Sequence, residues 1–97
     1  MSGAQLPQVS VIVPVYNMAD YVARCLHSIC AIDCQRLEII VIDDGSKDDS
    51  LAICQAKLAG RDDVKILTQA NAGQGVARNY GLQHATGKYV LFVDSDD

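Results

Sequence analysis

The chain has 97 residues, 49% of them hydrophobic, which is enough for one compact core and for at most one domain. Its formal net charge is −4 and its few lysines and arginines are scattered. This pattern excludes a nucleic-acid-binding surface, which needs clustered basic side chains. The apolar runs fall far short of the roughly 20 residues that cross a bilayer, so we expect no direct membrane span.

The first residues and the cysteines give no sign of export. Residues 1–5 lack the basic and apolar stretches of a secretory signal. We therefore expect a cytoplasmic location, with the parent protein at the inner face of the membrane. The cysteines lack the C-x-x-C spacing of a metal knuckle. Cys25, Cys30 and Cys54 fall in predicted helices, where a reduced cysteine acts as a small buried hydrophobe.

Strand and helix patterns alternate from the start of the chain. Val9–Val15 is mostly apolar and β-branched, which predicts a first strand, and Pro14 marks where its ladder pairing should stop. From Met18 onward, apolar residues recur at the spacing of a helix. Asn17 is placed to cap this helix at its N-terminus.

A second strand and helix follow in the same order. Leu37–Asp43 is a nearly continuous apolar run, which is typical of a strand covered on both faces in a parallel sheet. The next predicted helix runs from about Lys47 to Leu58, with Ser46 as its cap and Gly60 after its end. Val64–Thr68 then predicts a short third strand.

The last part of the chain completes an α/β pattern. The turn-rich segment Ala70–Gly75 leads into a predicted helix over Val76–Ala85, and Lys88–Val93 predicts a fourth strand. The βαβαβαβ order predicts a three-layer, Rossmann-like parallel sheet with helices on both faces and the strand order 3-2-1-4. Its topological switch lies between the first and fourth strands, where ligands bind beyond the carboxyl ends.

Unusual residues follow three of the predicted strands at these carboxyl ends. They are Pro14–Asn17 after the first strand, Asp43–Ser46 after the second and Asp94–Asp97 after the fourth. The three segments should meet at one edge of the sheet, with the two acidic clusters roughly 10 Å apart, since neighbouring strands are about 4.8 Å apart. A nucleoside diphosphate could span that gap.

The chemistry of these groups suits such a ligand. Concentrated carboxylates repel a phosphate unless a divalent cation lies between them, and Asp94 and Asp96 are the candidate ligands for Mg²⁺ or Mn²⁺. An ionised Asp43 only accepts hydrogen bonds and could read an N–H on a base edge. Tyr16 offers an aromatic face on which a base could stack. Arg78, in the third helix, could meet a diphosphate or pair with an aspartate, and both roles stay open.

Five segments together resemble the family-2 glycosyltransferases in order and spacing. They are Val11–Asn17, Val41–Ser46, Asn71–Gly73, Ala77–Gly81 and Val93–Asp97. The resemblance implies a GT-A fold and an inverting transfer of a sugar from a nucleotide donor, usually a UDP-sugar, to an acceptor hydroxyl. It also implies that residues 1–97 form the N-terminal nucleotide-binding part of a glycosyltransferase domain, cut after the D-x-D motif.

The resemblance assigns roles to the matching positions. Pro14 and Tyr16 line the base pocket, Asp43 hydrogen-bonds the base, and Asp94 and Asp96 form the D-x-D motif that holds Mn²⁺ or Mg²⁺. The catalytic base and the acceptor pocket are expected beyond Asp97. The full set of expected donor-binding residues is Pro14, Tyr16, Asn17, Asp43, Asp44, Asn71, Gly73, Arg78, Asp94 and Ser95.

The expected partners are a nucleotide-sugar donor and a carbohydrate or lipid-linked acceptor, in polysaccharide or glycoconjugate synthesis. The fourth strand would form an apolar edge, which also predicts a homodimer. A non-catalytic nucleotide-binding or scaffold module is the main alternative. A phosphoacceptor domain like those of response regulators fits less well, because the first strand is not followed by an acidic pair.

Overall fold

The computed structural model describes residues 7–31 and 36–93. Within these ranges, strands and helices alternate strictly along the chain, as the hydrophobic patterns predict. The elements are β1 (Val9–Val15), α1 (Ala19–Cys30), β2 (Leu37–Asp43), α2 (Ser50–Lys57), β3 (Val64–Thr68), α3 (Gln74–His84) and β4 (Tyr89–Phe92).

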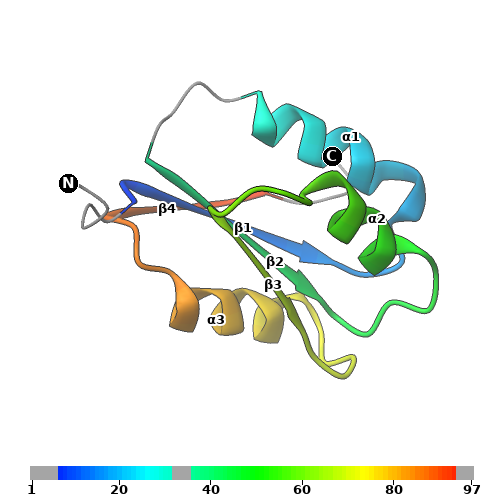
Figure 1. Cartoon of the computed structure of the whole chain (residues 1–97). Coiled ribbons are helices and arrows are strands. Elements are labelled where there is room, and N and C mark those ends of the chain that lie inside the picture. The colour runs from blue at the N-terminus through cyan, green and yellow to red at the C-terminus, as the bar shows by residue number, and fades with distance from the viewer. Residues whose placement is uncertain (1–6, 32–35, 94–97) are drawn as a thin grey trace.

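The strands form one parallel sheet in the order β3-β2-β1-β4 (Figure 1). This confirms the predicted topology, including the switch between β1 and β4. β1 pairs with β2 over its whole length, from Val9 opposite Leu37 to Val15 opposite Asp43. The carboxyl ends of these two central strands therefore finish side by side.

Pro14 affects the two sides of β1 differently. Pairing with β4 ends at Ile12 opposite Phe92, two residues before the proline, whereas pairing with β2 continues past it. The expectation that ladder pairing stops at Pro14 is therefore wrong for β2, and on the β4 side the residue opposite Pro14 lies outside the described residues. In a parallel ladder, alternate residues bond to alternate neighbours, so one missing N–H interrupts only one side.

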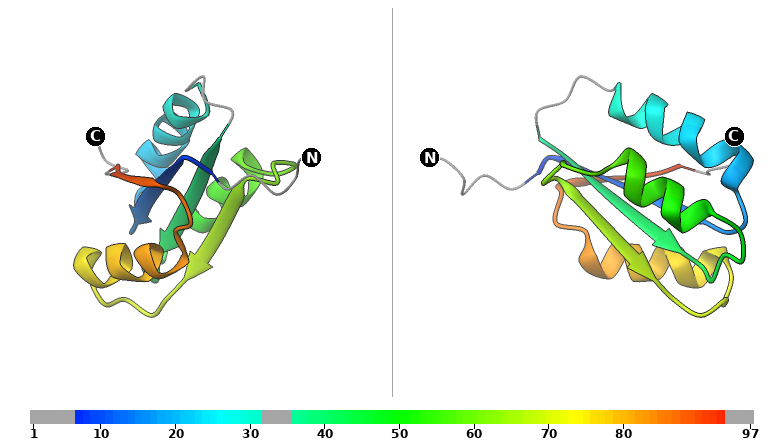
Figure 2. Two further views of the ribbon diagram at one scale, coloured as in Figure 1. Left: turned by 90° about the vertical axis from the view of Figure 1, so that its left-hand side faces the viewer. Right: turned by 45° about the vertical axis from the view of Figure 1, so that its right-hand side comes forward.

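Helices cover both faces of the sheet, as predicted. α1 and α2 lie on one face and α3 on the other, which the two views of Figure 2 show as three layers. Alternate residues of β2 divide between the two cores: Ile39 and Val41 pack towards α1 and α2, whereas Ile40 and Ile42 pack towards α3. Each such fully buried side chain contributes about 1.5–3 kcal/mol through removal from water.

The helices begin at other residues than the sequence suggests. α1 begins at Ala19, and its cap position is Met18 rather than Asn17. α2 begins at Ser50, three residues after the predicted start, because residues 45–49 form the turn that leaves β2. α3 begins at Gln74, two residues earlier than predicted, directly after the glycine at its cap.

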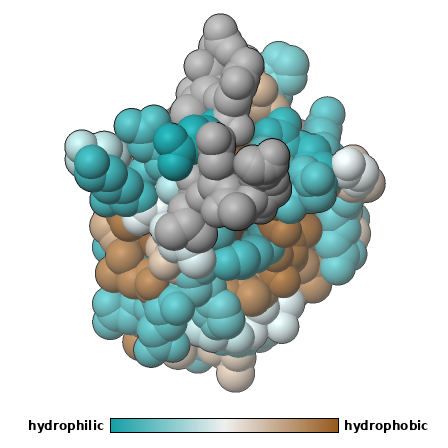
Figure 3. All heavy atoms as spheres, turned by 60° about the vertical axis from the view of Figure 1, so that its left-hand side comes forward, coloured by the Kyte–Doolittle hydropathy of each residue, from teal (hydrophilic) through white to brown (hydrophobic). Residues whose placement is uncertain are grey.

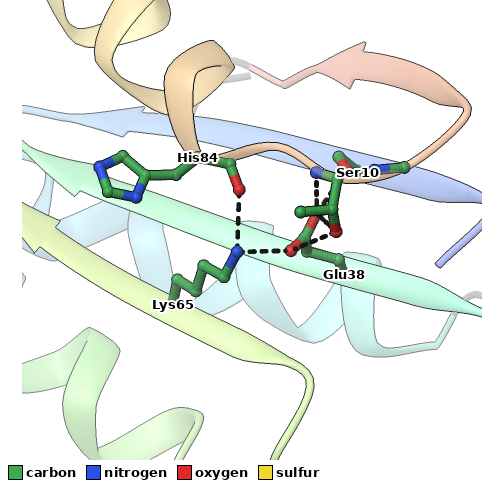
Figure 4. A network of polar contacts seen from close by, with 6 residues as sticks. Ser10, Glu38, Lys65 and His84 are labelled. Carbon is green, nitrogen blue, oxygen red and sulfur yellow. Dashed lines mark hydrogen bonds and ion pairs between the residues drawn. The ribbon is translucent and has the colours of Figure 1, made fainter. Parts of the chain in front are cut away.

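A buried polar network holds the sheet at the ends where β1 and β2 begin. Glu38 accepts hydrogen bonds from the Ser10 hydroxyl and from the backbone N–H of Thr86. Lys65 lies between Glu38, at 3.0 Å, and the backbone carbonyl of His84, at 2.8 Å (Figure 4). Ser10 also accepts the N–H of Gly87 at 2.8 Å. The network thus joins three strands to the connection between α3 and β4.

β4 is an edge strand with little cover. All four of its side chains are exposed, from 40% for Val90 to 56% for Tyr89.

Hydrophobic residues reach the surface in separate patches on the side of the molecule shown in Figure 3. In the ranges that the structure describes, none of the helices has the length and apolar character needed to cross a membrane.

Candidate functional site

A cavity of about 210 Å³ lies beyond the carboxyl end of β1. Three chain segments meet there: the end of β1, the turn after β2 and the loop between β3 and α3. Five of the residues predicted from the sequence line it, and three lining residues were not predicted. The lining consists of Pro14, Val15, Tyr16, Met18, Asp44, Asn71, Gly73 and Gln74.

The size of the cavity limits what it can hold. Ligand sites in proteins usually enclose about 300–1,000 Å³, so this cavity is too small for a complete nucleotide sugar. It suits a flat group such as a nucleobase. Tyr16, with 38% of its surface exposed, presents an aromatic ring to that space.

The carboxylate of Asp44 organises one wall of the cavity. Its Oδ1 accepts the backbone N–H of Ala72 at 2.7 Å and the side-chain amide of Gln69 at 2.8 Å. Its Oδ2 accepts the backbone N–H of Gly73 at 3.0 Å and the side-chain amide of Asn71 at 3.2 Å. All four acceptor positions of the carboxylate are thus used to hold the β3–α3 loop.

These bonds favour the charged form of Asp44. Burial alone would raise its pKa, but the hydrogen bonds from Gln69, Ala72 and Gly73 outweigh burial and hold the pKa below its ordinary value of 3.8. Asp44 is therefore an anion at neutral pH. The loop depends on that charge for its shape.

Glycine is required where the two loops approach each other. Gly45 has φ +72°, and a Cβ there would lie 2.8 Å from the backbone nitrogen of Asn71. Any other residue would push apart the turn after β2 and the loop that Asp44 holds. Gly73, with φ +101°, makes the sharp turn into α3.

Asp43 does not line the cavity. Successive side chains of a strand point to opposite faces, so Asp43 lies on the face of Val41, towards α2. The Cys54 thiol in α2 feels this nearby charge: its pKa is raised to about 12, mainly by burial and further by the neighbouring Asp43 and Cys25. Asp43 Oδ2 accepts the N–H of Ser46 at 3.1 Å. The structure thus brings Asp44, and not Asp43, to the cavity.

Asn17 joins two loops instead of facing the cavity. Its side-chain oxygen accepts the N–H of Lys47 at 2.8 Å, and its own N–H donates to the Ser46 hydroxyl at 3.0 Å. Its φ of +50° is a left-handed conformation that asparagine tolerates better than most residues. Further along, the N–H groups of Met18 and Ala19 donate to Ser50 and Asp48. These bonds confirm that the segments after β1 and β2 converge.

The first turn of α3 lies at the edge of the cavity. Gly73 and Gln74 both line the cavity, and a helix N-terminus attracts anions through its free N–H groups. Arg78 lies one turn further along, half-buried, with its guanidinium 3.4 Å from the side-chain oxygen of Gln74. It is close to the cavity but does not line it.

Val15, Met18 and Gln74 complete the lining and were not predicted from the sequence. The first two are apolar residues whose place beside a cavity depends on how the loop after β1 turns. Gln74 was assigned to the loop before the helix, so its place at the helix start was missed. A glycine followed directly by a helical pattern is the signal that could have found it.

The predicted metal ligands Asp94 and Asp96, together with Ser95, lie outside the residues that the structure describes. Within residues 7–31 and 36–93, no group of three or more His, Cys, Asp or Glu side chains is arranged to hold a metal ion. The last described residue, Val93, donates its N–H to the carbonyl of Ile12 at 3.0 Å.

Comparison with known proteins gives one consistent family. A family profile described as glycosyl transferase family 2 matches residues 10–97. The chain is 48% identical over 90 residues to the uncharacterized glycosyltransferase YibD of Escherichia coli (strain K12), an alignment that covers 93% of this chain and 26% of YibD.

Two solved structures share the fold. S. aureus TarS 1-349, crystallised with UDP-GlcNAc, matches with a TM-score of 0.85 and 39% identity over 92% of this chain and 26% of that one. The mannosyltransferase PcManGT from Pyrobaculum calidifontis, in complex with GDP-Man and Mn²⁺, matches with a TM-score of 0.86 and 31% identity, covering 96% and 28%. The chain thus spans about a quarter of the length of these proteins.

Proposed function

The chain belongs to glycosyl transferase family 2, and we propose that its part of the enzyme binds the nucleoside diphosphate of a nucleotide-sugar donor. The observation that carries this proposal is the cavity at the carboxyl end of β1, bounded by Tyr16, Asp44 and the start of α3. It lies beside the topological switch of the sheet, where α/β proteins bind their ligands. The solved relatives that contain UDP-GlcNAc and GDP-Man support it.

The base occupies the cavity. Its ring stacks on Tyr16 at about 1–3 kcal/mol, and Pro14 closes the other side. Asp44 accepts an N–H of the base edge. The longest of its four present bonds, 3.2 Å from the Asn71 amide, is the one that the base replaces, and Asn71 stays held by its second bond, to the Asp44 carbonyl at 3.1 Å. We assign this role to Asp44 in place of Asp43.

The diphosphate extends from the cavity towards β4. The N-terminus of α3 and Arg78 supply positive potential on one side. Asp94 and Asp96, with Ser95 between them in the sequence, would hold Mn²⁺ or Mg²⁺. Carboxylate oxygens suit both ions, and PcManGT was crystallised with Mn²⁺. An ion held by Asp94 and Asp96 would supply positive charge that offsets the negative charge of a diphosphate.

The full reaction needs more of the enzyme than this chain. We propose an inverting transfer, usually from a UDP-sugar, to a carbohydrate or lipid-linked acceptor in polysaccharide or glycoconjugate synthesis at the cytoplasmic side of the membrane. In this proposal the catalytic carboxylate is supplied by residues other than those that line the cavity. Donor binding is the contribution of this part.

We also propose that β4 associates with a second copy of the chain. Its apolar side chains are exposed and its outer edge has unpaired backbone groups among the described residues, which makes it a template for another strand.

Calorimetric titration of the chain with UDP, in the presence of Mn²⁺, tests the donor-binding proposal. We expect saturable binding, lost or strongly weakened in Asp96→Ala. Tyr16→Ala should weaken binding by about 5- to 150-fold, the equivalent of a lost stacking contact. Tyr21→Ala is the matched control, because Tyr21 is exposed on α1 and does not line the cavity. Absence of binding heat in the unaltered chain would refute the proposal.

A further inference from the structure

A second cavity lies between the end of β3 and the outer side of α3. It is an open depression of about 420 Å³ on the surface, lined mostly by exposed side chains, so a bound ligand would stay partly in contact with solvent. None of its lining residues lines the first cavity. They are Thr68, Gln69, Val76, Asn79, Tyr80 and Gln83. We propose that this cavity binds a neutral saccharide.

The helical part of the lining forms one stripe along α3. Val76, Asn79, Tyr80 and Gln83 are spaced by three or four residues, which places them on a single face of the helix. The stripe lies beside the buried face that contains Ala77 and Gly81. It is about 10 Å long at 1.5 Å per residue, which is comparable to a disaccharide.

The lining has no formal charge. The solvent side of a helix normally carries charged residues, yet this stripe and the two residues from the end of β3 offer only amide, hydroxyl, aromatic and aliphatic groups. An ionic ligand would find no counter-charge there. The groups therefore suit a neutral ligand that makes many hydrogen bonds.

The individual groups match the surface of a sugar ring. Each amide of Asn79 and Gln83 offers two donors and an acceptor, which can engage neighbouring hydroxyls. In the described part of the chain, neither side chain has a hydrogen-bond partner, and both are exposed. The ring of Tyr80, held edge-on against His84 at 5.2 Å, supplies an aromatic surface for the C–H face of a sugar.

The choice of a saccharide over another neutral polar ligand rests on the family, whose enzymes act on sugars. It does not depend on the proposed donor site. The two cavities are linked by one bond, since Gln69 lines the second cavity and donates to Asp44 of the first at 2.8 Å. A saccharide at the second cavity would therefore contact the same loop that forms part of the wall of the first cavity.

The test is an NMR titration of the ¹⁵N-labelled chain with chitotetraose and with cellotetraose, at millimolar concentration. We expect saturable shifts of the side-chain amide signals of Asn79 and Gln83 with at least one of these sugars. The double substitution Asn79→Ala/Gln83→Ala, on an exposed face where folding is not at risk, should weaken binding about tenfold or more. Gln55→Ala, an exposed glutamine on α2, is the matched control and should leave binding unchanged.

Absence of a saturable shift with both sugars, or binding that the double variant leaves unchanged, would overturn the saccharide proposal. A titration of the same sample with UDP and Mg²⁺ separates this result from the donor proposal. If the Gly73 signal shifts with UDP and the Asn79 and Gln83 signals shift with neither sugar, the saccharide proposal fails and the donor proposal stands.

Discussion

The backbone N–H of Gly73 donates to the carboxylate of Asp44 at 3.0 Å, across the gap between the turn after β2 and the start of α3. This bond and its neighbour from Ala72 fix the loop by its backbone, so the loop's shape depends on one side chain. Asp44 therefore acts on the cavity at the carboxyl end of β1 in two ways. It forms part of the wall, and it holds the opposite part in place.

Replacing Asp44 with Asn should destabilise the fold by about 1.5–3 kcal/mol. An amide has one acceptor oxygen, so the N–H of either Ala72 or Gly73 would face an NH₂ group, and the charge-assisted bonds would be lost. Urea denaturation measures the difference. Asp62→Asn, at an exposed aspartate between α2 and β3, should change stability by less than about 0.5 kcal/mol. Equal stability of the two variants would contradict this role of Asp44.

Stability should fall as the pH drops below about 4.5, the ordinary pKa of a glutamate. Burial would raise the pKa of Glu38, but bonds from Ser10, Thr86 and Lys65 outweigh burial and lower it. A carboxyl with a lowered folded pKa contributes stability above its unfolded pKa and loses it as the pH falls through the folded pKa. Urea midpoints across this range should show the loss.

The matched variant for this titration is Glu38→Gln. It should lower stability at neutral pH and reduce, without abolishing, the acid dependence, because Asp44 and Asp63 also have lowered pKa values. If the stability of Glu38→Gln depends on pH just as that of the unaltered chain does, Glu38 does not cause the loss of stability in acid.

Two glycines of α3 should respond in opposite ways to alanine. At Gly81 a Cβ would lie 2.7 Å from Ile12 Cγ2 and 2.8 Å from Ile42 Cδ1, so Gly81→Ala overpacks the core between α3 and the sheet. We expect a loss of about 1–3 kcal/mol. Gly75 has open space around it, and Gly75→Ala should be neutral or stabilise the helix by up to about 1 kcal/mol. Thermal unfolding of both variants provides the measurement, and a harmless Gly81→Ala would show that α3 packs less closely.

Association through β4 should be concentration-dependent and sensitive to charge. Light scattering of the unaltered chain should show dimers or larger species, and Leu91→Lys should shift the population towards monomers. Leu82→Lys changes a leucine of similar exposure on α3 and should have no such effect. A clean monomer at high concentration would contradict the proposed association.

The sequence predicts the two central strands, β1 and β2, well because nearly all of their residues are buried and most are apolar. The bounds of β1, β2 and β3 and the strand order agree with the structure. Helix starts were less predictable, because the residues before them bond to distant loops. Asn17 has the residue type of a cap, yet its side chain accepts from Lys47, about thirty positions away in the sequence.

The candidate site, too, could be predicted from the sequence only in part. Composition and strand ends indicate which segments meet, and Pro14, Tyr16, Asp44, Asn71 and Gly73 all line the cavity. A choice between adjacent aspartates depends on strand alternation at the very end of β2, where a shift of one residue exchanges the two faces. On that detail rests our proposal that Asp44, rather than Asp43, contacts the base.

Backbone chemical shifts of the chain on addition of UDP and Mg²⁺ test the central claim most directly. Donor binding at the cavity predicts saturable shifts at Tyr16, Asp44, Asn71 and Gly73, with residues of α2 unaffected. Shifts confined to other parts of the molecule, or none at saturating UDP, would contradict the assignment of this cavity as the donor site.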